Sequence, residues 1–558
     1  MFQQSGSADG KLGSAHRALV LFVLVLGAAF LVGINSWGPL ESSEARYAEI
    51  AREMLAGRDW LHPKLLGIEH FHKPPLTYWL TAVGLALAGP TALGVRLLPV
   101  LAVLAQVLLV YGLGTLLFDG HRYRALTAAI LYGTLPVVLI SALNVTTDAY
   151  LATLELAAAY GLLRHYHDGR WWSLYLCWLA LGLAFLTKGP VGFVLPLMAM
   201  MGYYFRRGQA RRPFTWHHGL GIVLFALIGL SWYALLIAEN PAFLRYFLVG
   251  HTVERFANAE AFGRAKPWWF YLVLAPATGL PWSVLLMVQA VRTGWRRLPQ
   301  LWRNVLVFWV LTPLVFFSLS QSKLIFYVLP IFPGVALLAA YYLHEMPAAQ
   351  RRNWYRGCLG LWAVLLLALA GLPWLAEEFN LTLSPSAALL PGTGLAALLL
   401  SAWQTRRRWP DTARLLLAAA LFTGTLLLAA KPLLRQNEVA FNGIRPVVER
   451  LRAEGMEQRP VLVYNELLPS LAFAQGRVPV SLYAGNSHLL RETQFEPTAA
   501  WHHTWLNTFA FTPNTLDSLR RQRPVLLVKG EVIAGQEWLV APFSHQLQVG
   551  EWRLYYDW

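Results

Sequence analysis

The chain is dominated by long apolar runs, and these most strongly limit what it can fold into. Thirteen of them are long enough to cross a bilayer, near residues 18–35, 97–118, 125–143, 149–164, 172–187, 190–205, 219–237, 270–291, 304–319, 324–343, 358–376, 387–403 and 414–430. Within hydrocarbon the backbone must satisfy its own hydrogen bonds, so such runs form helices. Charged residues make up only 14% of the 558 residues, against about a quarter in soluble chains. We therefore predict an all-α polytopic membrane domain over residues 1–436.

The last part of the chain, residues 437–558, has the composition of a soluble domain. Residues 460–465 and 524–529 have the pattern of buried strands, and residues 444–454 and 514–522 that of amphipathic helices. Alternation of helix and strand predicts a small α/β domain. Because it contains no glycine-rich nucleotide fingerprint, we interpret it as a lid or docking module.

The distribution of arginine predicts the orientation of the chain. The formal net charge is +16, but the arginines gather in short loops between apolar runs, as the positive-inside rule requires of cytoplasmic loops. Membrane orientation therefore explains the excess, and nucleic acid is excluded as a partner. The arginine-bearing loops alternate correctly only if the short run 76–89 lies flat as an interfacial helix on the outer face. The N-terminus is then cytoplasmic, and the first loop (36–96) and the C-terminal domain lie outside.

The first outer loop differs from the other polar segments because it mixes acids, bases and histidines. Its candidates for chemistry are Glu44, Arg46, His72 and Lys73. Each has a simpler reading, as a solvated ion pair, an interfacial histidine or a headgroup anchor. Together they favour a catalytic cavity at the membrane surface, of which this loop forms the first wall.

The later outer loops add further polar residues close to the hydrocarbon. These are Asp148, Lys188, His251, Arg255, Arg264, Lys323 and, one turn into the next run, Tyr327. Asp148 follows two threonines and could simply cap a helix. Charges at this depth are costly unless paired or used, and isolated cations recur in loops that the orientation rule should leave without them. A convergent cationic site for phosphate explains that recurrence.

The sequence leaves a metal ion open. Glu44, His72, Asp148 and His251 are suitable ligand types for zinc, but their spacing matches no metal motif. Cations alone can stabilise a phosphate leaving group, so we expect no required cofactor and keep a divalent cation such as zinc as the alternative. The two cysteines, Cys177 and Cys358, both fall in apolar runs and are expected to be core residues.

The first loop also resembles a known family. The segments EARYAEI (44–50), REML (52–55) and FHKPP (71–75) resemble the bacterial lipid A 4-amino-4-deoxy-L-arabinose transferases, which belong to the protein O-mannosyltransferase-like glycosyltransferases of the GT-C fold. Further matches are Asp148, Thr187-Lys188-Gly189, Arg255, Arg264, Pro281-Trp282 and Lys323 with Tyr327. The family usually has an Asp-Glu pair where this chain has Ser43-Glu44, and often Glu where it has His72. Glu44 and Asp148 are therefore the remaining acidic candidates.

The resemblance implies a function. An integral enzyme of the bacterial inner membrane, expected to be a monomer, would move 4-amino-4-deoxy-L-arabinose from undecaprenyl phosphate to a lipid A phosphate on the periplasmic face, conferring resistance to polymyxin and cationic peptides. Glu44, Asp148 and Lys73 would act on the reacting sugar and its leaving phosphate. The phosphates of donor and acceptor would be held by Arg46, Lys73, Lys188, Arg255, Arg264, Lys323 and Tyr327.

Two alternatives remain at this point. One is a related polyprenyl-phosphate-sugar transferase acting on protein or another glycan, with the same fold and phosphate site. The other is a transporter or flippase of a lipid-linked sugar. The second is disfavoured because the polar residues cluster on one face, and because no broken helix pair is expected at the midplane.

Overall fold

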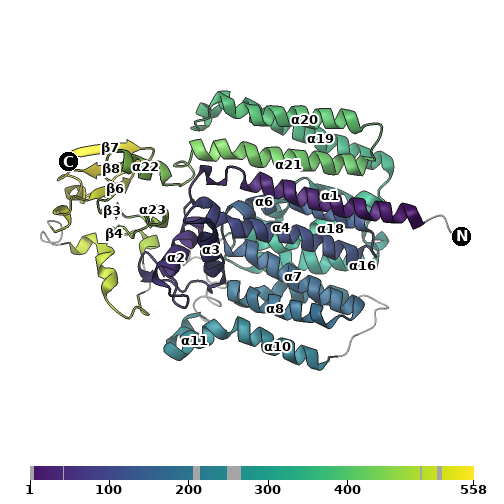
Figure 1. Ribbon diagram of the computed structural model, residues 1–558, viewed down its shortest axis with the longest axis horizontal. Coiled ribbons are helices and arrows are strands. Elements are labelled where there is room, and N and C mark those ends of the chain that lie inside the picture. The colour runs from purple at the N-terminus through teal and green to yellow at the C-terminus, as the bar shows by residue number, and fades with distance from the viewer. Residues whose placement is uncertain are drawn as a thin grey trace.

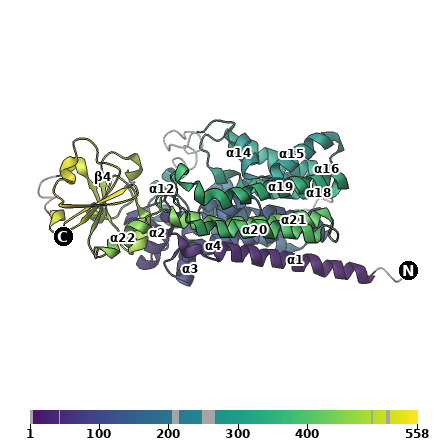
Figure 2. The same cartoon turned by 90° about the horizontal axis from the view of Figure 1, so that it is seen from above.

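A helical bundle carries a small sheet domain at one end (Figure 1). The computed structural model describes residues 5–41, 43–204, 214–247, 266–490, 493–511 and 518–557. The N-terminus lies at the end of the bundle remote from the sheet domain, and the view from above shows the same polarity (Figure 2). The predicted fold class, a polytopic helical membrane domain followed by a C-terminal α/β domain, is confirmed.

The bundle is built from helices that run along its long axis (Figure 1). Their bounds are α1 Ser5–Leu31, α4 Ala92–Leu117, α5 Arg122–Gly133, α6 Pro136–Leu143, α7 Thr147–Asp168, α8 Trp171–Lys188, η2 Gly189–Phe193, α9 Val194–Tyr204, α10 Trp216–Gly229, α11 Ser231–Glu239, α14 Phe270–Thr278, α15 Trp282–Thr293, α16 Gln300–Asn304, η6 Val305–Leu311, α17 Thr312–Leu319, η7 Ile325–Ile331, α18 Phe332–Glu345, α19 Ala348–Gly371, α20 Leu389–Thr405 and α21 Asp411–Gln436. The stretch containing α18 lies at the centre, since 83% of its apolar window is buried.

The number of spans differs from the thirteen expected. In the described part of the chain, eight helical stretches are long and apolar enough to cross a membrane, or up to eleven if each bent pair counts once. α7 is in neither count, and α8 to α9 form one continuous stretch, Trp171–Gly202. α7 carries Asp148, Glu155, Arg164 and Asp168, so its hydropathy is lower than that of its neighbours although it packs along α8.

The sequence led us to expect no broken helix pair at the midplane, but the described helices include pairs that are sharply bent. Among the residues that the structure describes, three pairs of helices are bent by more than 40°: α5 with α6 by 59°, α10 with α11 by 49°, and α14 with α15 by 110°. The run 270–291, expected to be one span, is the third of these pairs. Its break falls at Gly279–Pro281, where proline cannot donate to a helical hydrogen bond. The expected lack of broken helices can therefore no longer be used against a transporter. The choice between a transporter and a transferase depends on the site and the family.

The first outer loop folds into small elements that pack on the end of the bundle. They are η1 Ile34–Ser36, α2 Ser43–Gly57, the two-stranded hairpin β1 Lys64–Leu65 and β2 Ile68–Glu69, and α3 Leu76–Ala88. α3 has 13 residues and is apolar but short. At its crossing with α4, a Cβ on Gly84 would lie 2.2 Å from the carbonyl oxygen of Gly94, so only glycine permits this approach.

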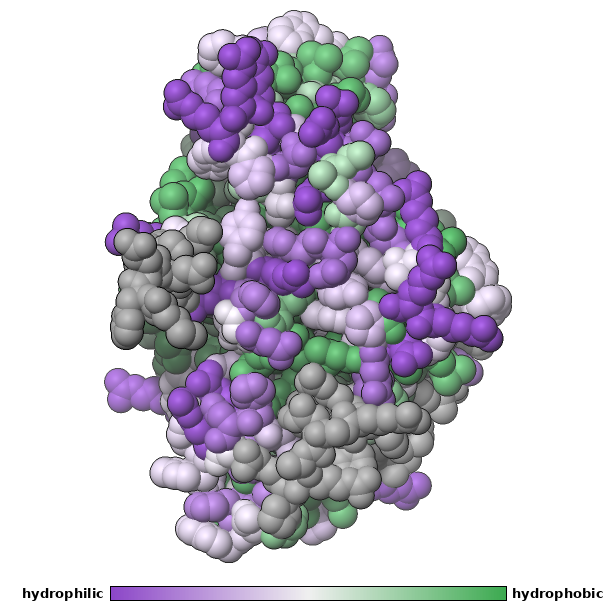
Figure 3. Space-filling view, turned by 90° about the vertical axis from the view of Figure 1, so that its right-hand side faces the viewer, coloured by the Kyte–Doolittle hydropathy of each residue, from purple (hydrophilic) through white to green (hydrophobic). Residues whose placement is uncertain are grey.

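At the opposite end of the bundle, basic side chains from several loops lie together. Arg122 lies 3.1 Å from His16 of α1, Arg124 lies 2.7 Å from Glu345 of α18, and Arg352 lies 3.6 Å from Asp411 of α21. Figure 3 views this end and shows hydrophilic side chains spread across it. Loops that the sequence predicts to be cytoplasmic thus share one end of the molecule.

The described residues of the C-terminal domain form a mixed sheet of six strands in the order β5-β4-β3-β6-β8-β7. The first four are parallel, and β8 and β7 are antiparallel. The bounds are α22 Arg445–Ala453, β3 Val461–Tyr464, α23 Pro469–Gln475, β4 Val480–Tyr483, β5 Trp505–Asn507, β6 Val525–Lys529, β7 His545–Val549 and β8 Trp552–Tyr556. The strands expected at 460–465 and 524–529 and the helix at 444–454 are found. Much of the helix expected at 514–522 lies outside the described residues.

The C-terminal domain is bound to the first loop through backbone groups and buried carboxylates. Glu438 accepts a hydrogen bond from the backbone N–H of Gly38, and Arg445 pairs with Glu438 at 2.7 Å. The backbone N–H of Glu41 donates to the carbonyl of Asn442, and its carboxylate accepts from the N–H of Ser470 at 2.7 Å. The first loop and the C-terminal domain therefore form one continuous unit at this end of the bundle.

Candidate active site

The centre of the site is an ion pair between the ends of α7 and α8. Asp148 lies in the first turn of α7, which Thr146 caps, and Lys188 is the last residue of α8, where Gly189 at φ +71° ends the helix. Lys188 Nζ lies 2.6 Å from Asp148 Oδ1, with the two side chains 10% and 8% exposed. A buried pair of this kind is energetically expensive unless it has further partners or a function.

Aromatic rings form one wall around this pair. The Nζ atom of Lys188 lies 3.9 Å from the ring centre of Tyr327, a cation–π contact. The hydroxyl of Tyr271 donates to the carbonyl of Leu324 and accepts from its N–H, at 2.8 and 3.1 Å, which fixes the start of the segment carrying Tyr327. Lys323 is 3% exposed and donates to the carbonyls of Ser320 and Lys266. The structure thus brings together three predicted residues, Asp148, Lys188 and Tyr327, and Lys323 lies four residues before Tyr327 in the same segment.

Beneath the pair lies a carboxyl group that sequence reasoning missed. Glu155 is 1% exposed and lies on α7, two turns after Asp148 and on the same face. It interacts electrostatically with Lys188 and Asp148, and its Oε2 atom has no hydrogen-bond partner among the described residues. An acid inside an apolar run is a functional signal by itself, and that signal was available from the sequence.

The segment with His72 and Lys73 lies against the same helix end. Phe71 and Leu76, which flank the two residues, share a hydrophobic cluster with Leu186, two residues before Lys188. The rings of His70 and His72 lie 4.0 Å apart, and both His72 and Lys73 are partly buried. This packing places the segment that carries His72 and Lys73 against the end of α8.

Glu44 has a different environment from the one expected of a group that contacts sugar. Both of its carboxylate oxygens bind Arg96, at 2.7 and 2.8 Å, and one also accepts from the N–H of Leu40. Arg96 in turn donates to the carbonyls of Ile34, Trp37 and Gly38 and lies 4.3 Å over the ring of Trp37. Because both partners are almost fully buried and their polar atoms are used, we reassign Glu44 to holding the loop in place.

Arg46 also lies on α2, two residues after Glu44. Its side chain is partly buried, and its Nε atom has no hydrogen-bond partner among the described residues. Its charge acts on Glu41, whose pKa burial raises to about 7 in spite of the hydrogen bonds from Ser470 and the charge of Arg46. Arg46 therefore retains hydrogen-bonding capacity for an anion.

Three predicted residues, His251, Arg255 and Arg264, lie outside the described residues. Within the described ranges no three His, Cys, Asp or Glu side chains lie close enough together to hold a metal ion. Glu44 is saturated by Arg96, and Asp148 faces the ammonium group of Lys188. Glu44, His72 and Asp148 thus do not form a ligand set.

Comparison with known proteins identifies the kind of enzyme. Residues 72–233 match the family described as dolichyl-phosphate-mannose-protein mannosyltransferase. An undecaprenyl phosphate-α-4-amino-4-deoxy-L-arabinose arabinosyl transferase of Pseudomonas fluorescens is 30% identical over 500 residues, 87% of this chain and 88% of its own length. A transferase of the same name from Pseudomonas aeruginosa is 31% identical over 490 residues, 84% of this chain and 86% of its own.

Two solved structures share the fold. ArnT from Cupriavidus metallidurans bound to undecaprenyl phosphate has a TM-score of 0.73 at 22% identity, covering 96% of this chain and 97% of its own. The apo state of the same protein has a TM-score of 0.71 at 23% identity, with 97% and 98% covered. The helical fold and the relatives define an integral membrane glycosyltransferase. Within that class, the chain belongs to the undecaprenyl phosphate-α-4-amino-4-deoxy-L-arabinose arabinosyl transferase family, and the resemblance seen in the first loop is confirmed.

Proposed function

We propose that this protein transfers 4-amino-4-deoxy-L-arabinose from undecaprenyl phosphate to a phosphate of lipid A. The observation that carries the proposal is the Asp148–Lys188 pair beside the ring of Tyr327, in a chain of this family. Such a transferase must hold a lipid-linked anion at the membrane surface and stabilise charge at the sugar. The site offers cations and a carboxylate at the ends of membrane helices.

The reaction breaks the bond between the anomeric carbon and the donor phosphate oxygen, which keeps the electron pair. An oxygen of the acceptor phosphate forms the new bond to the same carbon, so the products are undecaprenyl phosphate and the glycosylated lipid A phosphate. The acceptor is already an anion and needs no strong general base. The main demands are stabilisation of the leaving phosphate by cations and of the positive anomeric carbon by a carboxylate.

We assign Lys188, Lys73, Arg46, Lys323 and Tyr327 to the two phosphates, and Asp148 to the sugar. Lys188 and Asp148 neutralise each other at 2.6 Å. When the donor phosphate takes up Lys188, Asp148 becomes available to the anomeric carbon or to the amino group of the sugar. We also assign Arg255 and Arg264 to the phosphates, because the family pattern places them among the phosphate ligands. Polymyxin resistance would follow because an added amine lowers the negative charge of lipid A.

The proposal includes an orientation. The site and the C-terminal domain face the periplasm, and the N-terminus and the arginine-rich end face the cytoplasm. The positive-inside rule supports this, because Arg122, Arg124 and Arg352 lie at the end remote from Asp148 and Lys188. The enzyme is proposed to act as a monomer in the inner membrane.

Mass spectrometry of lipid A tests the function. The protein is expressed in a strain lacking its own aminoarabinose transferase but making the donor lipid. A mass gain of one aminopentose is expected, falling about 100-fold or more in Lys188→Ala and Asp148→Asn because charge stabilisation is lost, and also lost in Lys73→Ala. Arg407→Ala, an exposed residue at the far end, should behave like the wild type.

The outcomes separate the function from the residue assignments. Unmodified lipid A, with folded protein and donor lipid present, overturns the acceptor and points to protein or another glycan. A modified lipid A with a fully active Lys188→Ala variant keeps the function but removes Lys188 from the site. Movement of the donor lipid across vesicles without any transfer would instead indicate a flippase.

A further inference from the structure

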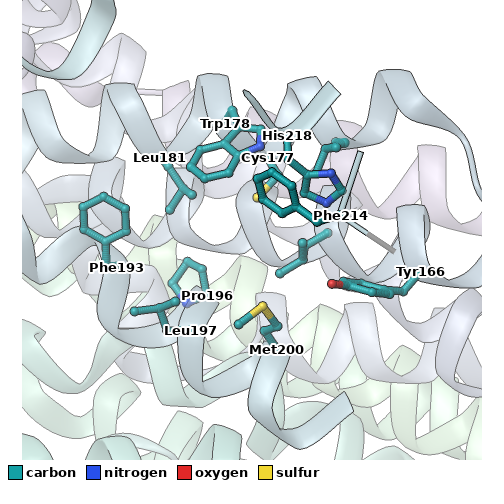
Figure 4. Close-up of a pocket in the computed structure, with 12 residues that line it drawn as sticks. Tyr166, Cys177, Trp178, Leu181, Phe193, Pro196, Leu197, Met200, Phe214 and His218 are labelled. Carbon is teal, nitrogen blue, oxygen red and sulfur yellow. The ribbon is translucent and has the colours of Figure 1, made fainter. Parts of the chain in front are cut away.

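A cavity of about 330 Å³ lies between α7, α8, α9 and the start of α10 (Figure 4). Leu181, Phe193 and Pro196 line one part of it, and Tyr166, Phe214 and His218 line the other. Figure 4 shows Phe193 and Tyr166 at opposite sides, with Met200 between them. Its lining is mostly apolar, and its volume is at the small end of the range for ligand pockets, about 300–1,000 Å³.

The polar end of the cavity is remote from the candidate active site. Tyr166 lies near the end of α7 and Asp148 in its first turn, a separation of about 27 Å at 1.5 Å per residue. On the proposed orientation, the polar end of the cavity is therefore at the cytoplasmic surface. The apolar part extends from there towards the middle of the membrane.

The groups at the polar end suit a headgroup at a membrane surface. Nδ1 of His218 accepts the backbone N–H of Thr215 at 3.1 Å, so the proton of the neutral ring is on Nε2, which can donate. Trp171 and Trp216 are 57% and 69% exposed at this end, as in an interfacial aromatic belt.

The charge at this end is positive. Arg164 and Arg170 share the single carboxylate of Asp168, at 3.4 and 3.2 Å, which leaves one positive charge in excess. Basic clusters between helices on the cytoplasmic side favour anionic lipid headgroups.

We propose that this cavity binds one acyl chain of an anionic phospholipid of the cytoplasmic leaflet, with the headgroup at Tyr166 and His218. The undecaprenyl donor fits less well, because its phosphate belongs at the Asp148–Lys188 end. A donor tail reaching the cavity would place its apolar terminus against the polar groups. A phospholipid of the cytoplasmic leaflet matches the polarity of the cavity in both parts.

The two cysteines of the chain provide a test that needs no mutation. Cys177 lines the cavity, whereas Cys358 is buried on α19, away from it. The full-length protein is delipidated in detergent and treated with a small membrane-permeant maleimide, with phosphatidylglycerol, phosphatidylcholine or undecaprenyl phosphate added. Phosphatidylglycerol should protect Cys177 and leave Cys358 unchanged.

A matched pair of variants checks the same site. Met200 lines the cavity, and Met201 does not and is 44% exposed. Met200→Trp should fill the cavity and lose the phosphatidylglycerol seen by native mass spectrometry, whereas Met201→Trp should keep it. Gel filtration and thermal unfolding confirm that both variants are folded.

Three results would overturn the proposal. They are equal protection by phosphatidylcholine, protection by undecaprenyl phosphate alone, and unchanged phosphatidylglycerol binding in a folded Met200→Trp variant. None of these readouts uses transfer activity, so the result is independent of the proposed reaction.

Discussion

At the scale of single residues, the buried charges near the membrane surface fall into two kinds. Arg96 and Glu44 satisfy each other and use their remaining polar atoms on the backbone. Asp148 and Lys188 are joined by a single ion pair, and Glu155 on the same face of α7 has a carboxylate oxygen with no hydrogen-bond partner among the described residues. The first arrangement suits a fixed support. The second can open to a substrate, because less of its hydrogen-bonding capacity is used.

Replacing Arg96 should therefore destabilise the first loop and should not act directly on the transfer reaction. Arg96→Met leaves the buried Glu44 carboxylate unpaired, and breaking such a pair costs about 3–5 kcal/mol. The thermal unfolding midpoint in detergent should fall, and the double variant Arg96→Met/Glu44→Gln should recover part of the loss. Arg124→Met, which breaks an exposed pair with Glu345, should change the midpoint little. A stable but inactive Glu44→Gln variant would instead return Glu44 to the reaction.

Two acids at the contact with the C-terminal domain predict a pH dependence. Burial raises the pKa of Glu41 to about 7, and burial together with the charge of Glu496 raises the pKa of Glu69 to about 7. Between the ordinary value of 4.5 and this value, the folded state holds protons that the unfolded state has lost. Stability should therefore fall as pH rises through this window and level off above it, by about 3 kcal/mol at most for each group.

Glu41→Gln isolates one of these groups. Glutamine resembles the protonated acid, so the variant should lose less stability than the wild type between pH 5 and pH 8 when unfolding is followed by protease digestion. Glu449 is an exposed carboxyl of α22. The Glu449→Gln variant serves as the control, and its stability should change with pH as that of the wild type does. An unchanged pH profile in Glu41→Gln would contradict the assignment.

At the scale of elements, the active site depends on how closely α7 and α8 approach. A Cβ on Gly161 of α7 would lie 2.5 Å from the backbone oxygen of Ser173 on α8. Since backbone cannot move aside cheaply, Gly161→Ala should destabilise the protein by about 1–3 kcal/mol and disturb the Asp148–Lys188 pair. Thermal unfolding and lipid A modification should both decline. Gly424→Ala on α21, where a Cβ meets open space, should be neutral or slightly stabilising.

Local sequence patterns predicted helices and strands well where the apolar residues were continuous or recurred with a single period. The apolar runs, the buried strands at β3 and β6 and the amphipathic helix α22 are of this kind. The hairpin of β7 and β8 was missed although Gly550-Glu551 between alternating segments is a recognisable turn. The bend between α14 and α15 was missed because apolar content does not report direction.

The candidate site was predictable only in part, for a related reason. Asp148, Lys188, Lys323 and Tyr327 lie at span ends, and topology brings span ends together. The role of Glu44 depends on Arg96, 52 residues away, and no spacing rule links them. Arg96 and Glu155 were detectable as isolated charges in apolar runs, but their partners were not.

At the scale of the whole molecule, one end of the bundle carries the candidate site and the other end the arginine-bearing loops between helices, which predicts a definite pattern of labelling. Glu378 precedes α20 and Arg407 follows it, and both are exposed. Cys177 and Cys358 are buried in the apolar helices α8 and α19, which an impermeant reagent does not enter, so their background labelling in the membrane is low. In cells with a permeabilised outer membrane, an impermeant maleimide should label Glu378→Cys and Gln548→Cys, and Arg407→Cys only after lysis. The reverse pattern would invert the proposed orientation.

α7 also bears on how the chain is made. The helix holds Asp148 and Glu155, and its composition falls short of that of a membrane span. A translocon that sorts segments by hydrophobicity would not retain it alone. α8 follows after two residues and packs along its length. The two helices would then enter the bilayer as a hairpin, and the Asp148–Lys188 pair would form during biosynthesis as the hairpin closes.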